Sequence, residues 1–169
     1  RKLLQTLLKC ATGDGNLLMN VGPMPDGTMP PDHVARLREA GDWLKAHGEA
    51  VYGTRGGPFR NDETGGMTCR GNTIYVHVWD WPAHRVCLPE INARILSVYS
   101  PTARDLHHEM VDGRLCFSVG EQDRLSLDTL VVLTLDRPAE AVRNNDLPWR
   151  LQQTGKGHAA LIVEDFLGQ

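Results

Sequence analysis

A short apolar run passes directly into a dense turn in the stretch Asn16-Leu-Leu-Met-Asn-Val-Gly-Pro-Met-Pro-Asp-Gly27. A nearly continuous apolar segment of this length is typical of a strand that is buried on both faces, as in a parallel sheet. Glycine, proline and aspartate are frequent in the second half of the stretch, and these residues favour turns. The stretch therefore predicts a buried strand over residues 16–21, followed by a loop over residues 22–28.

Helical patterns flank this strand on both sides. Four leucines between Leu3 and Leu8 recur at helical spacing, which predicts the end of an amphipathic helix over residues 2–10. A second helix is expected to begin at the prolines before Asp32, because proline is tolerated in the first turn, and to end near Gly48. The order helix, buried strand, loop and helix predicts a piece of an alternating α/β fold.

The chain changes character after about Gly53. Thr73-Ile-Tyr-Val-His-Val-Trp79 alternates with period two, which is typical of a strand in an antiparallel sheet. Asp112-Gly113 between two apolar runs favours a hairpin. Further strands are predicted over residues 85–88, 94–99, 106–111, 115–119 and 129–135. Several short strands separated by turns indicate an antiparallel sandwich.

Composition argues against two classes of partner. The 169 residues carry a formal net charge of −3, so there is no basic excess to neutralise a nucleic-acid backbone. Mean hydropathy is −0.33, and no apolar run approaches the roughly 20 residues that a membrane-spanning helix needs. We therefore expect neither a nucleic acid nor a membrane as partner.

The cysteines and histidines do not predict a metal site. The four cysteines form no CxxC pair, so the usual spacing of zinc ligands is absent. They fit buried or half-buried free thiols, although a disulfide between Cys87 and Cys116 stays open. His107 and His108 are neighbours on a predicted strand and point to opposite faces, which favours a solvated edge over a shared metal ion.

Tyr75, His77 and Trp79 lie on one face of the predicted strand over residues 73–79. Such a face can stack on a sugar through its aromatic rings. More often it packs against a neighbouring part of the protein, and this is the interpretation we expect.

The carboxylates of the α/β zone form no convincing acid–base pair. Asp26 precedes Gly27 and is typical of a turn, while Glu49 follows Gly48 and is typical of a solvated or capping position. Sites in parallel α/β folds lie beyond the C-terminal ends of the strands. Asn20 and the loop over residues 22–28 occupy that position, so any pocket that touches this chain is expected there.

The stretch Asp14–Gly27 resembles the last barrel strand and the following loop of the α-L-fucosidases, glycoside hydrolase family 29. Trp43–Thr54 is similar to the final barrel helix of that family and its exit, while Arg55–Phe59 and Gly71–Val78 look like the start of its C-terminal β-domain. Asp14 stands where the family usually has glycine. The resemblance covers about residues 1–136.

The resemblance implies an α/β fragment, the final unit of a (β/α)8 barrel, followed by an all-β antiparallel sandwich. The implied boundaries are residues 1–54 for the end of the barrel, 55–137 for the sandwich and 138–169 for a linker or tail. The chain begins with arginine, not methionine, and the barrel part has too few strands to close by itself. We therefore expect it to be part of a longer protein.

The activity implied is that of a retaining exo-glycosidase that removes terminal α-L-fucosyl residues from glycans without a metal or other cofactor. Retention requires two carboxylates about 5 Å apart, and in this family they come from earlier barrel strands. We therefore assign no catalytic residue and expect the chain alone to be inactive. Asn20, Gly22, Pro23 and Asp26 are expected to shape the rim of the pocket for a fucosylated glycan. A secreted or periplasmic location follows from the same resemblance.

A non-catalytic carbohydrate-binding or interaction module is the alternative function. In that case Tyr75, His77, Trp79 and Trp81 would form the sugar platform. Burial of Trp79 against the helical part of the chain would favour the structural interpretation instead.

Overall fold

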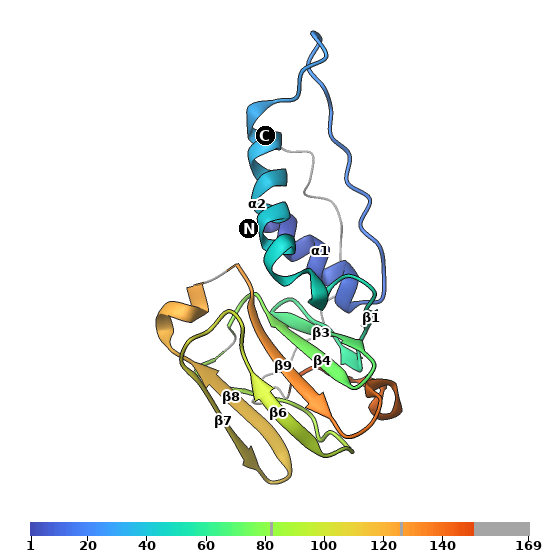
Figure 1. Cartoon of the computed structure of the whole chain (residues 1–169), viewed down its shortest axis with the longest axis vertical. Coiled ribbons are helices and arrows are strands. Elements are labelled where there is room, and N and C mark those ends of the chain that lie inside the picture. The colour runs from blue at the N-terminus through green and yellow to red at the C-terminus, as the bar shows by residue number, and fades with distance from the viewer. Residues whose placement is uncertain (82, 126, 151–169) are drawn as a thin grey trace.

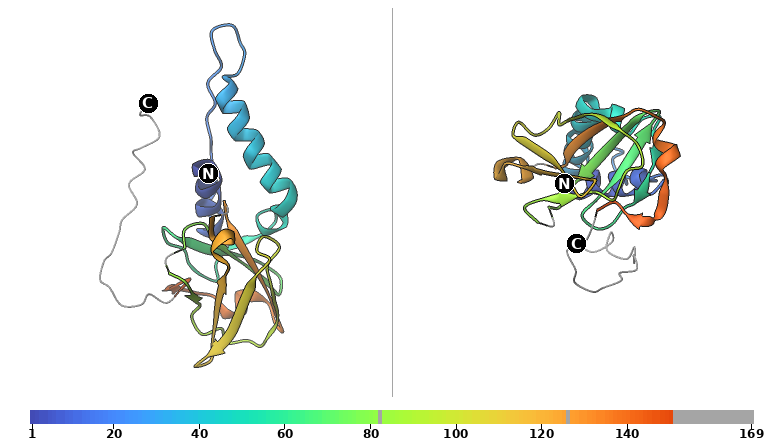
Figure 2. Two further views of the ribbon diagram at one scale, coloured as in Figure 1. Left: turned by 90° about the vertical axis from the view of Figure 1, so that its left-hand side faces the viewer. Right: turned by 90° about the horizontal axis from the view of Figure 1, so that it is seen from below.

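The computed structural model describes residues 1–81, 83–125 and 127–150. Two helices precede a set of mainly antiparallel sheets (Figure 1). Helix α1 (Lys2–Thr12) and helix α2 (Pro31–His47) lie on one side of the sheets, and the 3-10 turn η1 (Gly48–Ala50) leads into them. The connection between the helices extends beyond the far end of α2, so the molecule is elongated (Figure 2).

Three sheets follow the helices. The five-stranded sheet has the order β1 (Arg55–Gly56), β3 (Gly65–Arg70), β4 (Thr73–Val78), β9 (Thr129–Leu135) and β6 (Ile95–Tyr99). The three-stranded sheet has the order β5 (Val86–Cys87), β8 (Arg114–Val119) and β7 (Leu106–Val111). The remaining elements are the parallel pair β10 (Asn144–Pro148) and β2 (Phe59–Arg60), and the 3-10 turns η2 (Glu121–Leu125) and η3 (Ala139–Val142).

The antiparallel part of the predicted fold is confirmed. Strands β7 and β9 have the predicted bounds, and β4 ends one residue before the predicted Trp79. The β7–β8 hairpin turns at Asp112 and Gly113, whose φ angles are 50° and 76°. Two successive residues with positive φ suit the right-handed twist of a tight hairpin, which explains the Asp-Gly pair there.

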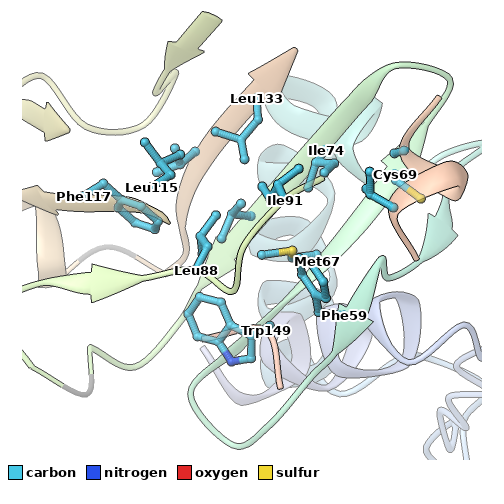
Figure 3. Close-up of a cluster of buried hydrophobic side chains, with 14 of the residues drawn as sticks. Phe59, Met67, Cys69, Ile74, Leu88, Ile91, Leu115, Phe117, Leu133 and Trp149 are labelled. Carbon is cyan, nitrogen blue, oxygen red and sulfur yellow. The ribbon is translucent and has the colours of Figure 1, made fainter. Parts of the chain in front are cut away.

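The main core lies between the five-stranded and three-stranded sheets. Phe59, Met67 and Leu133 point into it from one side, and Leu88 and Phe117 from the other (Figure 3). All five side chains are at most 2% exposed, so together they form a continuous apolar interior.

Cys87 and Cys116 form a disulfide within the three-stranded sheet. They are registered partners on β5 and β8, so the bridge joins two directly opposed residues. The expectation of free thiols is therefore wrong for Cys87 and Cys116, whose disulfide the sequence had left open, and confirmed for Cys10, which is half-buried, and Cys69, which is buried.

The opposite face of the five-stranded sheet packs against the helices. Leu4 and Leu8 of α1 join Trp43 of α2 and Trp79 in a second apolar cluster. Ala50 of η1 packs with side chains of β4 and β9 in a third. Strand β4 is thus buried on both faces, although its period-two pattern is typical of a strand with one solvated face.

Residues 16–21 are not a buried strand, and that prediction is wrong for the described structure. The segment has no regular secondary structure, and Leu18 is 97% exposed. A strand of a parallel sheet gains its hydrogen bonds and its burial from neighbours on both sides. Within the part of the chain that the structure describes, no strand pairs with this segment.

Helix length and polarity also bear on membrane association. Among the described residues, no helix is both long enough and apolar enough to cross a membrane.

Candidate substrate-binding loop

The connection between α1 and α2, residues 15–30, is the candidate site (Figures 1 and 2). At its tip, Met24 N donates to Thr28 O at 2.8 Å and Gly27 N donates to Met24 O at 2.9 Å. Gly27 has a φ of +82°, a conformation that glycine adopts without a steric penalty. These contacts close a turn at the end of two extended segments.

Asp26 fixes this turn. Its Oδ1 accepts hydrogen bonds from Thr28 N at 3.0 Å and from Thr28 Oγ1 at 2.7 Å. These bonds from the Thr28 backbone and side chain lower the pKa of Asp26, because they stabilise the ionised carboxylate. Asp26 is therefore a turn-forming hydrogen-bond acceptor, and its low pKa makes it a poor proton donor near neutral pH.

The four predicted rim residues lie on this one loop. Asn20, Gly22, Pro23 and Asp26 are all exposed. The space around Gly22 is open, because a Cβ added there would meet no atom within 4 Å. The structure thus places the four residues on one projecting segment, but the described residues do not enclose a pocket around them.

Large apolar side chains lie before and between these four positions. Leu18 is 97% exposed, and Met19, Val21 and Met24 are each 37–39% exposed. Exposed apolar side chains grouped on one segment mark a surface suited to contact with another protein segment or a ligand. The loop therefore combines an exposed apolar stretch with a polar turn.

Three of the four residues of the predicted aromatic platform are buried, and Trp81 is half-buried. Tyr75, His77 and Trp79 are 4%, 0% and 2% exposed, and Trp79 Nε1 donates to Glu63 O at 2.7 Å. Trp81 donates to Thr129 Oγ1 at 3.0 Å and packs edge-on against Phe117. The packing interpretation is confirmed for Tyr75, His77 and Trp79, and the sugar-platform interpretation of that face is wrong, because the helices cover it.

His77 forms a buried polar pair that sequence inspection missed. His77 Nδ1 lies 2.8 Å from Asp128 Oδ2, and His77 Nε2 lies 3.3 Å from Thr68 Oγ1. Thr68 Oγ1 in turn donates to Ala50 O at 2.5 Å. The chain of contacts links β4, β3 and η1 away from solvent, so it joins the sheet to the helical part and cannot touch a substrate.

Other titratable side chains are scattered. His107 and His108 are both exposed, and His107 lies 3.0 Å from Asp105, as a solvated edge predicts. Glu49 is exposed on η1, while Asp26 lies on the projecting loop. In the described ranges, no group of three or more histidine, cysteine or acidic side chains is placed to hold a metal ion.

Comparison with known proteins relates this loop to a protein family. The family model named Alpha-L-fucosidase matches residues 1–49, which include the whole connection between α1 and α2. The N-terminal part of the chain is therefore similar to the α-L-fucosidase family. The match includes residues 14–27, so the resemblance to α-L-fucosidases that this motif indicates is confirmed.

Curated relatives are similar over part of their length. The α-L-fucosidase of Branchiostoma floridae is 40% identical over 83 residues, which is 47% of this chain and 18% of that protein. The plasma α-L-fucosidase of Homo sapiens is 44% identical over 61 residues, 36% of this chain and 13% of that protein. The chain thus spans less than a fifth of these two relatives.

Solved structures extend the similarity across the sheets. α-L-Fucosidase isoenzyme 1 from Paenibacillus thiaminolyticus aligns with a TM-score of 0.68 and 25% identity over 80% of this chain and 34% of that chain. The α-fucosidase of Thermotoga maritima aligns with a TM-score of 0.59 and 27% identity over 79% of this chain and 33% of that chain. The helices and the antiparallel sheets therefore share their arrangement with glycoside hydrolases.

Proposed function

We propose that the chain is the C-terminal part of a retaining exo-glycosidase that hydrolyses terminal α-L-fucosyl residues of glycans. The observation that carries the proposal is the loop over residues 15–30, which the family model matches and which projects without a described partner. A solved Thermotoga maritima relative with 26% identity holds fucose. Residues 1–54 then belong to a barrel, 55–137 to the sandwich and 138–169 to a linker or tail.

The loop and its flanks carry the apolar side chains and the backbone groups that the last strand of a barrel would use. Leu18 and its apolar neighbours offer side chains for burial, and the backbone of residues 16–21 is free to pair with an adjacent strand. The turn around Asp26 is already formed by its own hydrogen bonds, so it needs no further contact for its shape. Asn20, Gly22, Pro23 and Asp26 would then face the fucosyl group from the barrel rim.

The disulfide supports a secreted or periplasmic location. Disulfides such as Cys87–Cys116 form and persist in oxidising compartments and are rare in the cytosol. Glycoconjugates outside the cytosol are the substrates that such a location offers.

Activity with an aryl α-L-fucoside tests the proposal. The chain alone should give no turnover, because the retaining mechanism needs two paired carboxylates and the described residues of this chain provide none. The longer enzyme that contains the chain should hydrolyse the fucoside and retain the anomeric configuration. Turnover by the purified 169-residue chain would contradict the placement of the catalytic residues, and an inactive longer enzyme would contradict the proposed activity.

A further inference from the structure

The loop over residues 15–30 begins directly after a carboxylate that is bound to the sheets. Asp14 has a φ of +63°, and its Oδ2 accepts a hydrogen bond from Arg55 Nη2 at 2.8 Å. Its Oδ1 accepts a second hydrogen bond from Gly56 N at 3.1 Å. Arg55 and Gly56 form strand β1 at the edge of the five-stranded sheet. One side chain at the start of the loop therefore holds a charged group and a backbone amide of the sheet.

The amide bond is the more important of these two contacts. The ion pair adds little by itself, because the side chain of Arg55 is 68% exposed. Gly56 is buried, so its amide needs an acceptor within the protein, and the Asp14 carboxylate supplies it. Hydrogen bonds to a charged acceptor are stronger than those between neutral groups. The carboxylate of Asp14 is therefore well suited to fix the position of its own backbone against β1.

The backbone of β1 lies directly against the chain at this point. A Cβ added to Gly56 would clash with Asp14 N and lie 2.7 Å from Thr12 O, so only glycine fits there. Gly56 O accepts a hydrogen bond from Arg143 Nη2 at 2.6 Å. Gly56 is thus held at its amide by Asp14 and at its carbonyl by Arg143, which makes it a firm point of attachment.

The last turn of α1 is attached to the sheets beside this point. Asn61 Nδ2 donates to Lys9 O and to Thr12 Oγ1, both at 2.9 Å. Gly15 N donates back to Cys10 O at 2.8 Å. The chain is therefore held against the sheets up to Asp14, and the loop leaves from this fixed end.

The direction of the loop depends on such fixed ends. Residues 16–21 have no regular secondary structure, and the turn around Asp26 is closed by hydrogen bonds within the loop. These internal bonds set the shape of the tip but not its place relative to the sheets. That place follows from the two ends of the loop, which are Asp14 and the first turn of α2 at Pro31.

We propose that Asp14 is a positioning residue for the substrate loop: its carboxylate fixes the start of the loop against β1 and thereby sets where Asn20 lies. The inference rests on the proposed function, because it takes this loop as the rim of the fucose pocket. Asp14 acts through the loop and needs no contact with the substrate.

Amide hydrogen exchange measured by NMR tests the attachment on the full 169-residue chain. Asp14→Gly removes the carboxylate without backbone strain, because glycine readily adopts a positive φ. The protection factors of the Gly56 and Gly15 amides should each fall about tenfold, since a hydrogen bond to a charged group is lost. Gly15 is the decisive reporter, because its own bond goes to Cys10 O and not to the carboxylate.

Two further variants separate the carboxylate from the backbone. Asp14→Asn keeps an acceptor for the Gly56 amide and tolerates the positive φ, so it should retain most of the protection. Asp112→Gly is the matched control, because Asp112 also has a positive φ, 50°, but lies exposed in the β7–β8 hairpin. It should leave the protection of Gly15 and Gly56 unchanged.

A double-mutant cycle tests the positioning role in the longer enzyme that we propose contains this chain. Asp14→Gly should raise KM for an aryl α-L-fucoside about threefold with little change in kcat, because a displaced rim weakens binding of the substrate. In an Asn20→Ala background the same substitution should have no further effect, because Asp14 acts through the loop that carries Asn20. A merely structural role would cost the same in both backgrounds.

An unchanged protection factor for Gly15 in the Asp14→Gly chain would overturn the proposal, even if Gly56 alone exchanged faster. Additive effects of Asp14→Gly and Asn20→Ala on KM would overturn it as well. A longer enzyme without fucosidase activity would contradict the proposed function instead, and the protection factors would then still decide whether Asp14 fixes the loop.

Discussion

At the scale of single residues, His77 and Asp128 form a buried polar pair between distant parts of the sequence. Both side chains are at most 1% exposed, and their atoms Nδ1 and Oδ2 lie 2.8 Å apart. A buried polar group is tolerated only with its partner in place, because the partner replaces the lost hydration. The pair is separated by 51 residues in the sequence, so no local pattern could have indicated it.

Replacing Asp128 by alanine should lower the free energy of unfolding by about 3–5 kcal/mol, because it leaves the His77 ring buried without its partner. Urea denaturation followed by tryptophan fluorescence measures this change. Glu109→Ala is the control, since the ion pair of Glu109 with Arg85 is exposed and should contribute at most about 1 kcal/mol. Similar small losses in both variants would show that the buried pair does not hold the sheet to the helical part.

At the scale of elements, strand β3 shows why a strand can escape sequence inspection. Its sequence Gly-Gly-Met-Thr-Cys-Arg lacks clear alternation, and glycine is depleted in strands. The structure requires both glycines. A Cβ on Gly65 would lie 2.5 Å from the Trp149 ring, and one on Gly66 would lie 2.7 Å from Thr12 of α1. β3 is therefore a strand in close contact with other segments on both faces.

Gly65→Ala should consequently destabilise the protein by about 1–3 kcal/mol, because the backbone or the Trp149 ring must shift. Thermal unfolding followed by circular dichroism checks the prediction. Gly41→Ala within α2 is the opposite case, since no atom lies within 4 Å of its added Cβ. Alanine there should raise stability by about 0.5–1 kcal/mol through helix propensity. Equal effects of the two substitutions would contradict the close packing of β3.

At the scale of the whole molecule, local sequence patterns predicted where helices and strands form, but they predicted less well which residues are buried. The hairpin at Asp112-Gly113, the strand over residues 129–135 and the helix from Pro31 follow from turn chemistry, alternation and the proline rule. Burial depends on distant partners. Tyr75 and His77 face helices that precede them by tens of residues, and residues 16–21 lack a described neighbouring strand.

The candidate site was predictable only through its motif. Asn20 and Asp26 carry no chemistry that identifies a sugar pocket by spacing alone, and the structure shows them exposed on a projecting turn. The ordered run from Asp14 to Gly27 carries the resemblance to α-L-fucosidases, and the model of that family covers the run.

The most direct measurement of the central claim is kcat/KM for an aryl α-L-fucoside with Asn20→Ala in the longer enzyme that we propose contains this chain. If Asn20 lies on the rim of the fucose pocket, losing its amide should reduce kcat/KM by about tenfold or more, equivalent to about 1.4 kcal/mol of transition-state stabilisation. Met110→Ala, on the far sheet, should leave kcat/KM unchanged. An unchanged kcat/KM in a folded, active Asn20→Ala enzyme would contradict the assignment of the loop to the substrate pocket.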